Sequence, residues 1–250
     1  MNTLFFNRLE VKYLIDRTTR SALARDLAVL MRPDLHAGPD GCYQVRSLYF
    51  DTPNYAAYDE KLSGEAVRHK LRVRSYGQDP GKSSLIRLEV KSRYLSYVHK
   101  ITVDVSRQDY GEIECSLKRH RLPPRRFLED DKSSKEFFRI QRQYNMWPVI
   151  LIQYRRQAYE RMEINRTRVN FDDQLLATRN LEVLGPLRSA RRLLDHGHAV
   201  FEIKVDNTMP YWLHMLIAKY NLENEAISKY CYAVRSEARF SSIARWDNAS

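Results

Sequence analysis

Three tripeptides in this chain place an acid and a base two residues apart, with one β-branched apolar residue between them. They are Glu10-Val11-Lys12, Glu89-Val90-Lys91 and Glu202-Ile203-Lys204. Residues two apart in a β-strand point to the same face, so each tripeptide puts a carboxylate beside an ammonium on one surface. Such a lysine can bind a phosphate oxygen, and such a glutamate can bind a divalent cation or neutralise a neighbouring base.

Basic side chains alternate with apolar ones in other segments as well. Lys70, Arg72 and Arg74 alternate with Leu71 and Val73. Taking one face of all the expected strands gives 13 basic side chains, namely Arg8, Lys12, Lys70, Arg72, Arg74, Arg87, Lys91, Arg93, Lys100, Arg155, Arg166, Arg168 and Lys204. The six acids on matching faces are Glu10, Glu89, Asp104, Asp172, Glu202 and Asp206. For any single strand, a polar face in water explains this alternation. Only the combined excess of seven basic side chains over acidic ones needs a further explanation.

The elements that must carry these residues follow from the periodicity of apolar side chains. Period-two alternation or β-rich composition predicts eight strands, at about 8–13, 45–51, 68–76, 85–93, 98–105, 149–157, 164–172 and 199–206. Helical spacing of apolar residues predicts a helix that Asp16 caps and that stops before Pro33, a second through Phe137 and Tyr144, and a third after Pro210. A fourth apolar stripe runs from Ile227 to Val234, and 118–132, with Pro123-Pro124, is expected to be a long exposed loop.

We expect these elements to form one domain over residues 1–250, of the α+β class. Eight antiparallel strands are enough for a closed β-barrel, and the helices can pack outside on the apolar faces of the strands. The charged faces would then line the interior, where each uncompensated charge costs several kcal/mol. A tunnel that holds a polyanion removes this conflict, because arginine and lysine together can surround a phosphate chain.

Composition limits the partners and the location. The formal net charge of +11 favours a polyanion, such as nucleic acid, an anionic membrane surface, a nucleotide or polyphosphate. No apolar run approaches the ~20 residues of a membrane span, and residues 1–12 lack a signal-peptide core, so a cytoplasmic location is expected. Cys42, Cys115 and Cys231 are too far apart to suggest a disulfide framework or a zinc site.

Several short motifs occur in a specific order along nearly the whole chain. They are Arg8-Leu-Glu-Val-Lys-Tyr13, Ser47-Leu-Tyr-Phe-Asp-Thr52, His69-Lys-Leu-Arg-Val-Arg74, Leu88-Glu-Val-Lys91, Gln153-Tyr-Arg155 with Tyr159, Arg168 followed by Asp172, Phe201-Glu-Ile-Lys204 and Ser228-Lys-Tyr230. In this order they resemble the polyphosphate-polymerase domain of the vacuolar transporter chaperone (VTC) family, a branch of the triphosphate tunnel metalloenzyme (CYTH-like) superfamily.

The resemblance implies transfer of the ATP γ-phosphate to a growing polyphosphate chain, with Mn²⁺ or Mg²⁺ required. It implies catalytic roles in holding phosphates for Lys12, Arg72, Arg74, Lys91, Arg155, Arg168 and Lys204. Further phosphate-binding residues would be Lys70, Lys100, Arg166, Ser228 and Lys229. Glu202 is the first candidate for the metal and Glu10 the second, whereas Glu89, between Arg87 and Lys91, is expected to act as a counter-charge.

Two other functions remain open at this point. Hydrolysis of tripolyphosphate or nucleoside triphosphates could use the same tunnel, although Arg8 replaces the first glutamate of the Glu-x-Glu-x-Lys motif typical of the hydrolase and cyclase branches. A non-catalytic polyphosphate-binding module is the second alternative. The expected partners are ATP and inorganic polyphosphate, triphosphate or pyrophosphate, and the sequence leaves open whether a membrane partner protein receives the product. Nucleic acid is disfavoured because no aromatic platform is interleaved with the basic residues.

Overall fold

The computed structural model describes residues 8–83, 85–95, 97–129, 132–162 and 166–237. These residues divide between two compact units. Unit 1 comprises 1–44, 154–175 and 194–228, and unit 2 comprises 45–153, 176–193 and 229–250. Each unit has its own hydrophobic core, because no residue of one core cluster belongs to the other unit. Within the described residues no helix is long and apolar enough to cross a membrane.

Eight strands follow one another by hydrogen bonding in the order β1-β10-β8-β7-β3-β4-β5-β6. Their bounds are β1 (Arg8–Ile15), β3 (Cys42–Asp51), β4 (Val67–Gly77), β5 (Leu85–Tyr94), β6 (Tyr97–Ser106), β7 (Trp147–Arg161), β8 (Thr167–Thr178) and β10 (Ala199–Asp206). Two short strands lie off this path: β2 (Arg32–Pro33) pairs with β7, and β9 (Arg191–Arg192) pairs with β8. All resolved registers are antiparallel.

The prediction of eight antiparallel strands in an α+β fold is confirmed, but the prediction of a closed barrel is wrong. In the described part of the chain the path is open, since β1 and β6 end it and do not pair with each other. Closure would require a hydrogen-bonded ladder between the first and last strands. Strand β6 instead has the largely exposed pattern of an edge strand.

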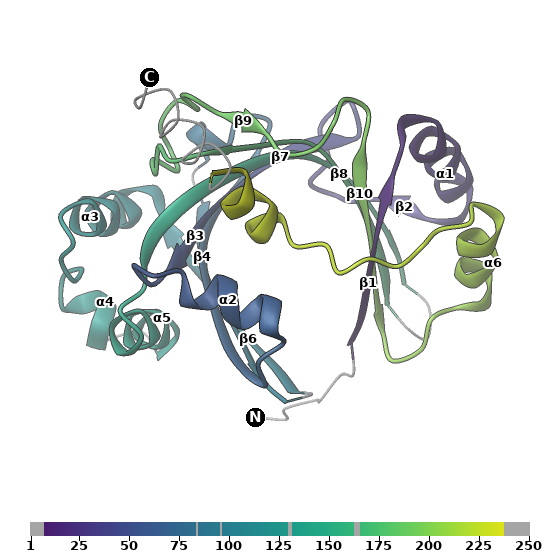
Figure 1. Ribbon diagram of the computed structural model, residues 1–250. Helices are drawn as coiled ribbons and strands as arrows, with labels where there is room; N and C mark the ends of the chain where they lie inside the picture. Colours follow the sequence, from purple (N-terminus) through teal and green to yellow (C-terminus); the bar gives the residue numbers. More distant parts are fainter. Residues whose placement is uncertain (1–7, 84, 96, 130–131, 163–165, 238–250) are drawn as a thin grey trace, which may run out of the picture. The chain divides into compact units, whose positions relative to one another are not determined.

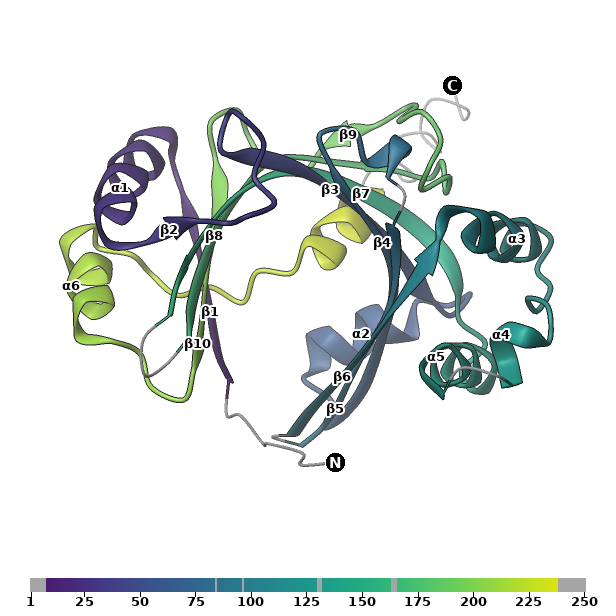
Figure 2. The same cartoon turned by 180° about the vertical axis from the view of Figure 1, so that it is seen from behind.

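In unit 1, two helices cover the apolar face of β1, β8 and β10. Helix α1 (Arg17–Leu30) begins where the Asp16 carboxylate accepts a hydrogen bond from the Thr19 backbone, as predicted, and buries Leu23 and Leu27. Helix α6 (Tyr211–Lys219) follows Pro210, also as predicted, and buries Leu213. Both helices lie beside β1 and β10 in the two views (Figure 1, Figure 2). Their core includes Val169, Phe171, Phe201 and Ile203.

In unit 2, helices α3 (Arg107–Lys118), α4 (Arg126–Glu129) and α5 (Lys132–Gln143) gather on one side of β3 to β6 (Figure 1). The apolar row Leu71, Val90 and Ile101 crosses three strands and faces this side. The remaining elements are α2 (Ala56–Ser63), the short 3₁₀ turn η1 (Pro80–Lys82) and the helical residues 229–237. The prediction of helices packed on the apolar strand faces is therefore confirmed in both units.

Helices α2, α3 and α4 were not predicted. Helix α4 lies inside 118–132, and Phe127 is buried there, so the prediction of a continuous exposed loop is only partly right. Most strands extend beyond their predicted bounds by one to four residues. Strand β8 begins at Thr167 rather than 164, and residues 163–165 lie outside the described part.

Candidate functional site

The strand face of unit 2 opposite its helices carries several basic side chains. Lys70, Lys91 and Lys100 stand directly opposite one another on β4, β5 and β6. Like charges in directly opposite positions destabilise a sheet. A row of three lysines is therefore a position at which a bound anion would relieve repulsion.

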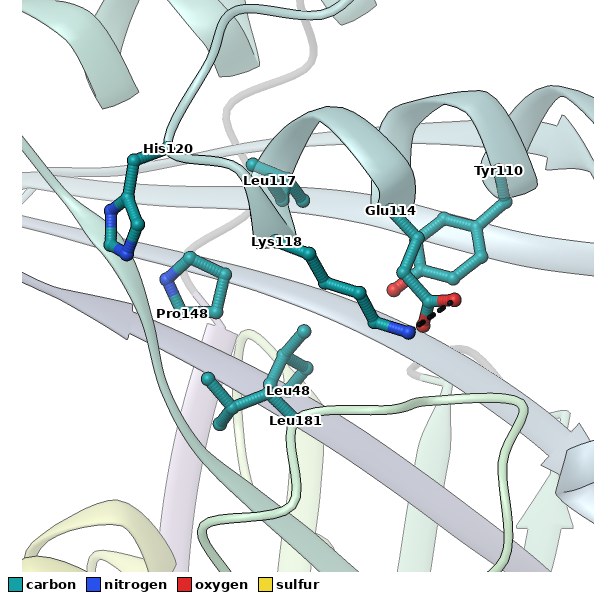
Figure 3. A pocket seen from close by; sticks show the side chains of 8 residues that line it. All are labelled: Leu48, Tyr110, Glu114, Leu117, Lys118, His120, Pro148 and Leu181. Carbon is teal, nitrogen blue, oxygen red and sulfur yellow. Dashed lines mark ion pairs between the residues drawn. The ribbon is translucent and has the colours of Figure 1, made fainter.

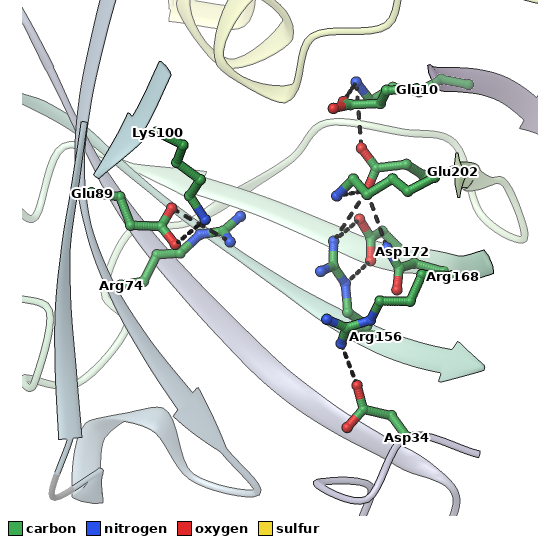
Figure 4. A network of polar contacts seen from close by, with 12 residues as sticks. Glu10, Asp34, Arg74, Glu89, Lys100, Arg156, Arg168, Asp172 and Glu202 are labelled. Carbon is green, nitrogen blue, oxygen red and sulfur yellow. Dashed lines mark hydrogen bonds and ion pairs between the residues drawn. The ribbon is translucent and has the colours of Figure 1, made fainter. Parts of the chain in front are cut away.

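The adjoining row contains the carboxylate of this face. Glu89 lies opposite Arg72 and is buried. Its Oε2 is 2.5 Å from Arg72 Nε and 3.8 Å from an Arg74 nitrogen, and its Oε1 is 3.0 Å from Lys100 Nζ (Figure 4). Burial raises the pKa of Glu89, but the charges of Arg72, Arg74 and Lys100 outweigh burial and hold it far below its usual value. Glu89 is thus a counter-charge, as predicted, although its partners are on neighbouring strands rather than at Arg87 and Lys91.

Strand β3 adds hydroxyl groups to the same face. Arg74 Nε donates to Ser47 Oγ at 3.2 Å. Tyr49 lies two residues further along β3, and the positive charges of Arg72, Arg74 and Lys229 lower its pKa. Burial raises this pKa, but the three cations outweigh burial and bring it below the ordinary value. The hydroxyl of Tyr49 therefore lies in a strongly positive environment.

In unit 1, two of the Glu-x-Lys tripeptides pair with each other. Antiparallel register sets Glu10 opposite Lys204 and Lys12 opposite Glu202. Lys12 Nζ lies 2.5 Å from Glu10 and 3.4 Å from Glu202, and Lys204 Nζ lies 2.9 Å from Glu202. Burial lowers the pKa of Lys204 to about 8, although Glu202 opposes this change.

Two consecutive arginines of β7 have different partners. Arg156 forms a two-pronged pair with the buried carboxylate of Asp172, at 2.6 and 2.8 Å, and lies 3.7 Å from Glu202 (Figure 4). Arg155 forms its pair with Asp173, which also binds Arg20 of α1. Consecutive strand residues point to opposite faces, so Arg156 lies with Glu202 while Arg155 lies toward α1.

Two further cations of this face, Arg168 and Arg166, are also paired with carboxylates. Arg168 binds Asp34, and it lies 3.9 Å from Glu160. Arg166 binds Glu160 at 3.0 and 3.1 Å. Unit 1 thus supplies a carboxylate for each of these bases, whereas in unit 2 one glutamate serves three cations. The basic excess predicted from the sequence is concentrated on β4 to β6.

The carboxylates at β1 and β10 fit a divalent cation only if phosphate oxygens complete its shell. Among the described residues there is no group of three or more His, Cys, Asp or Glu side chains that could hold a metal. Glu202 lies beside Asn170, whose Nδ2 donates to it at 3.1 Å and whose buried Oδ1 has no hydrogen-bond partner. Two carboxylates and one free amide oxygen are ligands that Mg²⁺ or Mn²⁺ accepts together with phosphate.

A cavity of about 170 Å³ lies elsewhere in unit 2, under α3 (Figure 3). Its walls are largely apolar and include Leu48, Leu117 and Leu181. Lys118 contributes an ammonium group, but Glu114 and Glu182 pair with it at 3.7 and 2.9 Å. This cavity lacks the cation excess of the strand face and is a poor site for a polyanion.

The structure therefore groups most of the predicted residues into two clusters. Unit 1 brings together Lys12, Lys204, Arg168, Glu10 and Glu202, with Arg166 at the margin. Unit 2 contains Lys70, Arg72, Arg74, Lys91, Lys100 and Lys229, and Ser228 is the last residue of unit 1. Sequence reasoning missed Arg156, Asn170 and Tyr49. The signal available for Arg156 was the pair of consecutive arginines in β7 and the pair of consecutive aspartates in β8. Because consecutive strand residues face opposite sides, one arginine and one aspartate belong to each face.

Comparison with solved structures identifies the class of fold. A candidate adenylate cyclase from Bacillus halodurans has a TM-score of 0.51 and 12% identity, covering 88% of this chain and 93% of its own. A second candidate adenylate cyclase, from Vibrio parahaemolyticus, gives 0.46 at 11% identity over 88% and 94%, and a Pyrococcus horikoshii protein gives 0.45 at 11% over 93% and 98%. At these identities only the fold is shared, and the last two scores are too low to establish even that.

The VTC domain family matches residues 7–237. The chain therefore belongs to the VTC domain family, as its ordered motifs predicted. A search of curated protein sequences finds no significant match.

Proposed function

We propose that this protein is an ATP-dependent polyphosphate polymerase, which transfers the γ-phosphate of ATP to a growing polyphosphate chain. The observation that carries the proposal is the row of Lys70, Lys91 and Lys100, next to Arg72 and Arg74, with one glutamate among them. Membership in the VTC domain family supports a substrate made of linked phosphates. A repeating polyanion matches a repeating row of cations better than a single phosphate does.

The proposed reaction needs little covalent help from protein side chains. The nucleophile would be the terminal phosphate of the acceptor chain, which is already ionised at neutral pH, so no general base is required. Positioning and neutralisation of charge supply most of the catalysis in phosphoryl transfer. Arginines would hold phosphate oxygens through forked donors, and lysines would act as point charges between them.

A divalent cation is part of the proposal. Glu202 and Glu10 would hold it, with Asn170 Oδ1 as an additional oxygen ligand, and it would neutralise charge on the phosphate oxygens. The bases around Glu202 hold its carboxylate in a fixed orientation. Glu202→Ala should therefore lower activity more strongly than Glu10→Ala, because Glu202 is the more deeply buried carboxylate.

The decisive experiment is product analysis after incubation with ATP and Mn²⁺. The proposal predicts long polyphosphate, with one ADP formed for each phosphate added to the chain. Lys91→Ala should abolish the formation of both products. A matched control is Lys82→Ala, because Lys82 belongs to an exposed pair with Asp79 in η1, away from the lysine row. Orthophosphate as the sole phosphate product would refute the polymerase and indicate a triphosphatase instead.

A further inference from the structure

Asp51 is a buried carboxylate at the end of β3, outside the group of charged residues that the proposed reaction uses. Its Oδ1 accepts hydrogen bonds from the backbone N–H groups of Thr52 and Ala57, at 2.7 and 2.8 Å. Its Oδ2 accepts from the backbone of Tyr58 at 3.1 Å and from the hydroxyl of Tyr230. Asp51 therefore binds both the first turn of α2 and Tyr230, which lies 179 residues further along the chain.

Tyr230 connects this carboxylate to the basic face. It is buried, and its ring stacks on that of Tyr49 with centroids 5.3 Å apart and planes inclined by 25°. Burial and the negative charge of Asp51 raise the pKa of Tyr230, so its hydroxyl stays protonated and donates. A second contact, from Arg235 Nε to the Tyr58 hydroxyl at 3.3 Å, links the same helical segment to α2.

Lys229 directly precedes Tyr230, so the hydrogen bond of Tyr230 to Asp51 and its ring stack on Tyr49 also restrain the backbone of Lys229. The stack of Tyr230 on Tyr49 brings the backbone of Lys229 to β3, where Ser47 accepts a hydrogen bond from Arg74 at 3.2 Å, and the charges of Lys229, Arg72 and Arg74 all lower the pKa of Tyr49. Lys229 comes from the helical segment 229–237, whereas both arginines come from β4. Its position among them depends on what holds the segment, and the bond between Asp51 and Tyr230, the ring stack and the contact of Arg235 with Tyr58 all contribute.

We propose that Asp51 and Tyr230 are positioning residues that hold Lys229 beside Arg72 and Arg74, so that the three cations bind one segment of a polyphosphate. This inference rests on the phosphate site of the proposed function but not on polymerase activity. Tyr49 contributes the ring surface on which Tyr230 stacks. A lysine whose backbone is already fixed binds an anion more tightly than one on a mobile segment, because less backbone entropy is lost on binding.

The test is binding of inorganic tripolyphosphate, measured by isothermal titration calorimetry at several salt concentrations. Tyr230→Phe keeps the stacked ring and removes only the hydroxyl. We expect it to weaken binding about threefold to tenfold, in the range of one ordinary hydrogen bond. It should also reduce the slope of log affinity against log salt by about one, as loss of a phosphate-contacting lysine does.

A double-mutant cycle separates positioning from general damage. In a Lys229→Ala background, Tyr230→Phe should cost less than about twofold, because the residue that it positions is gone. The matched control is Tyr220→Phe, which removes a similar hydrogen bond from a tyrosine to Asp26, 2.8 Å long, in unit 1. This control should leave affinity and salt slope unchanged. Asp51→Asn should reproduce the Tyr230→Phe effect if Tyr230→Phe folds poorly.

Unchanged affinity for Tyr230→Phe, or equal losses with and without Lys229, would overturn the inference. A wild-type protein that binds tripolyphosphate but makes no polyphosphate would refute the polymerase and leave this inference standing. A wild-type protein that does not bind tripolyphosphate would refute both.

Discussion

Replacing Glu89 by glutamine tests the central electrostatic feature of unit 2. The substitution keeps the size and one acceptor oxygen of the side chain and removes its charge. Arg72, Arg74 and Lys100 would then lose the carboxylate that they share at 2.5, 3.8 and 3.0 Å. Three cations on adjacent strands would face one another with weaker compensation, so unit 2 should become less stable.

The size of this effect follows from burial. Breaking a buried ion pair by removing one partner costs about 3–5 kcal/mol. Glu89 is 3% exposed, but Arg72 and Lys100 are 25% and 47% exposed, so water recovers part of that loss. We therefore expect a loss of about 2–3 kcal/mol in the free energy of unfolding, which for a chain of this size lowers Tm by about 5–10 °C.

The dependence on pH gives a second measurement of the same interaction. The pKa of Glu89 in the folded protein lies below its ordinary value of about 4.3. Its contribution to stability is therefore complete above the unfolded value and is lost as the pH falls below it. The difference in Tm between wild type and Glu89→Gln should be constant from pH 6 to pH 8 and should shrink below about pH 4.

Thermal unfolding followed by circular dichroism provides the measurement, with Asp104→Asn as the matched control. Asp104 pairs with Arg87 at 2.8 Å on the same face, but both side chains are more than a third exposed. Its loss should cost less than about 1 kcal/mol. Equal effects of the two substitutions would refute the view that Glu89 is a structural counter-charge. Added tripolyphosphate should raise the Tm of Glu89→Gln more than that of Asp104→Asn, because it supplies the missing negative charge.

Three further predictions concern the basic faces. Affinity for tripolyphosphate should fall as the pH rises through about 8, where Lys204 loses its proton, and titrations from pH 6.5 to 9.5 should show no such fall for Lys204→Arg. Arg156→Lys should reduce polyphosphate synthesis more than Arg155→Lys, because only Arg156 lies with Glu202, and equal rates in the two variants would contradict this assignment. Tripolyphosphate should bind more tightly than single-stranded DNA at every salt concentration in a competition assay, and equal affinity for both would contradict specificity for linked phosphates.

Local pattern was sufficient wherever one strand or helix determines the outcome. Period-two alternation located eight strands, and the Asp16 cap and Pro210 located the starts of α1 and α6. It failed for α2, which buries only Ala57, and it overlooked α3, although Ser106 caps that helix and Tyr110, Ile113 and Leu117 have helical spacing. It also could not decide barrel closure, because pairing of the first and last strands depends on the twist and length of all the strands between them.

The candidate site shows the same division between local and tertiary information. The sequence by itself determined that acids and bases share strand faces and that bases are in excess, because side chains in a strand alternate with a fixed period of two. Only the tertiary structure decided the partners. Antiparallel register makes Glu10-Val11-Lys12 and Glu202-Ile203-Lys204 neutralise each other, while Glu89 serves cations on two neighbouring strands and Lys91 stands in a row of lysines. Register and strand order connect residues far apart in the chain, and no local spacing encodes them.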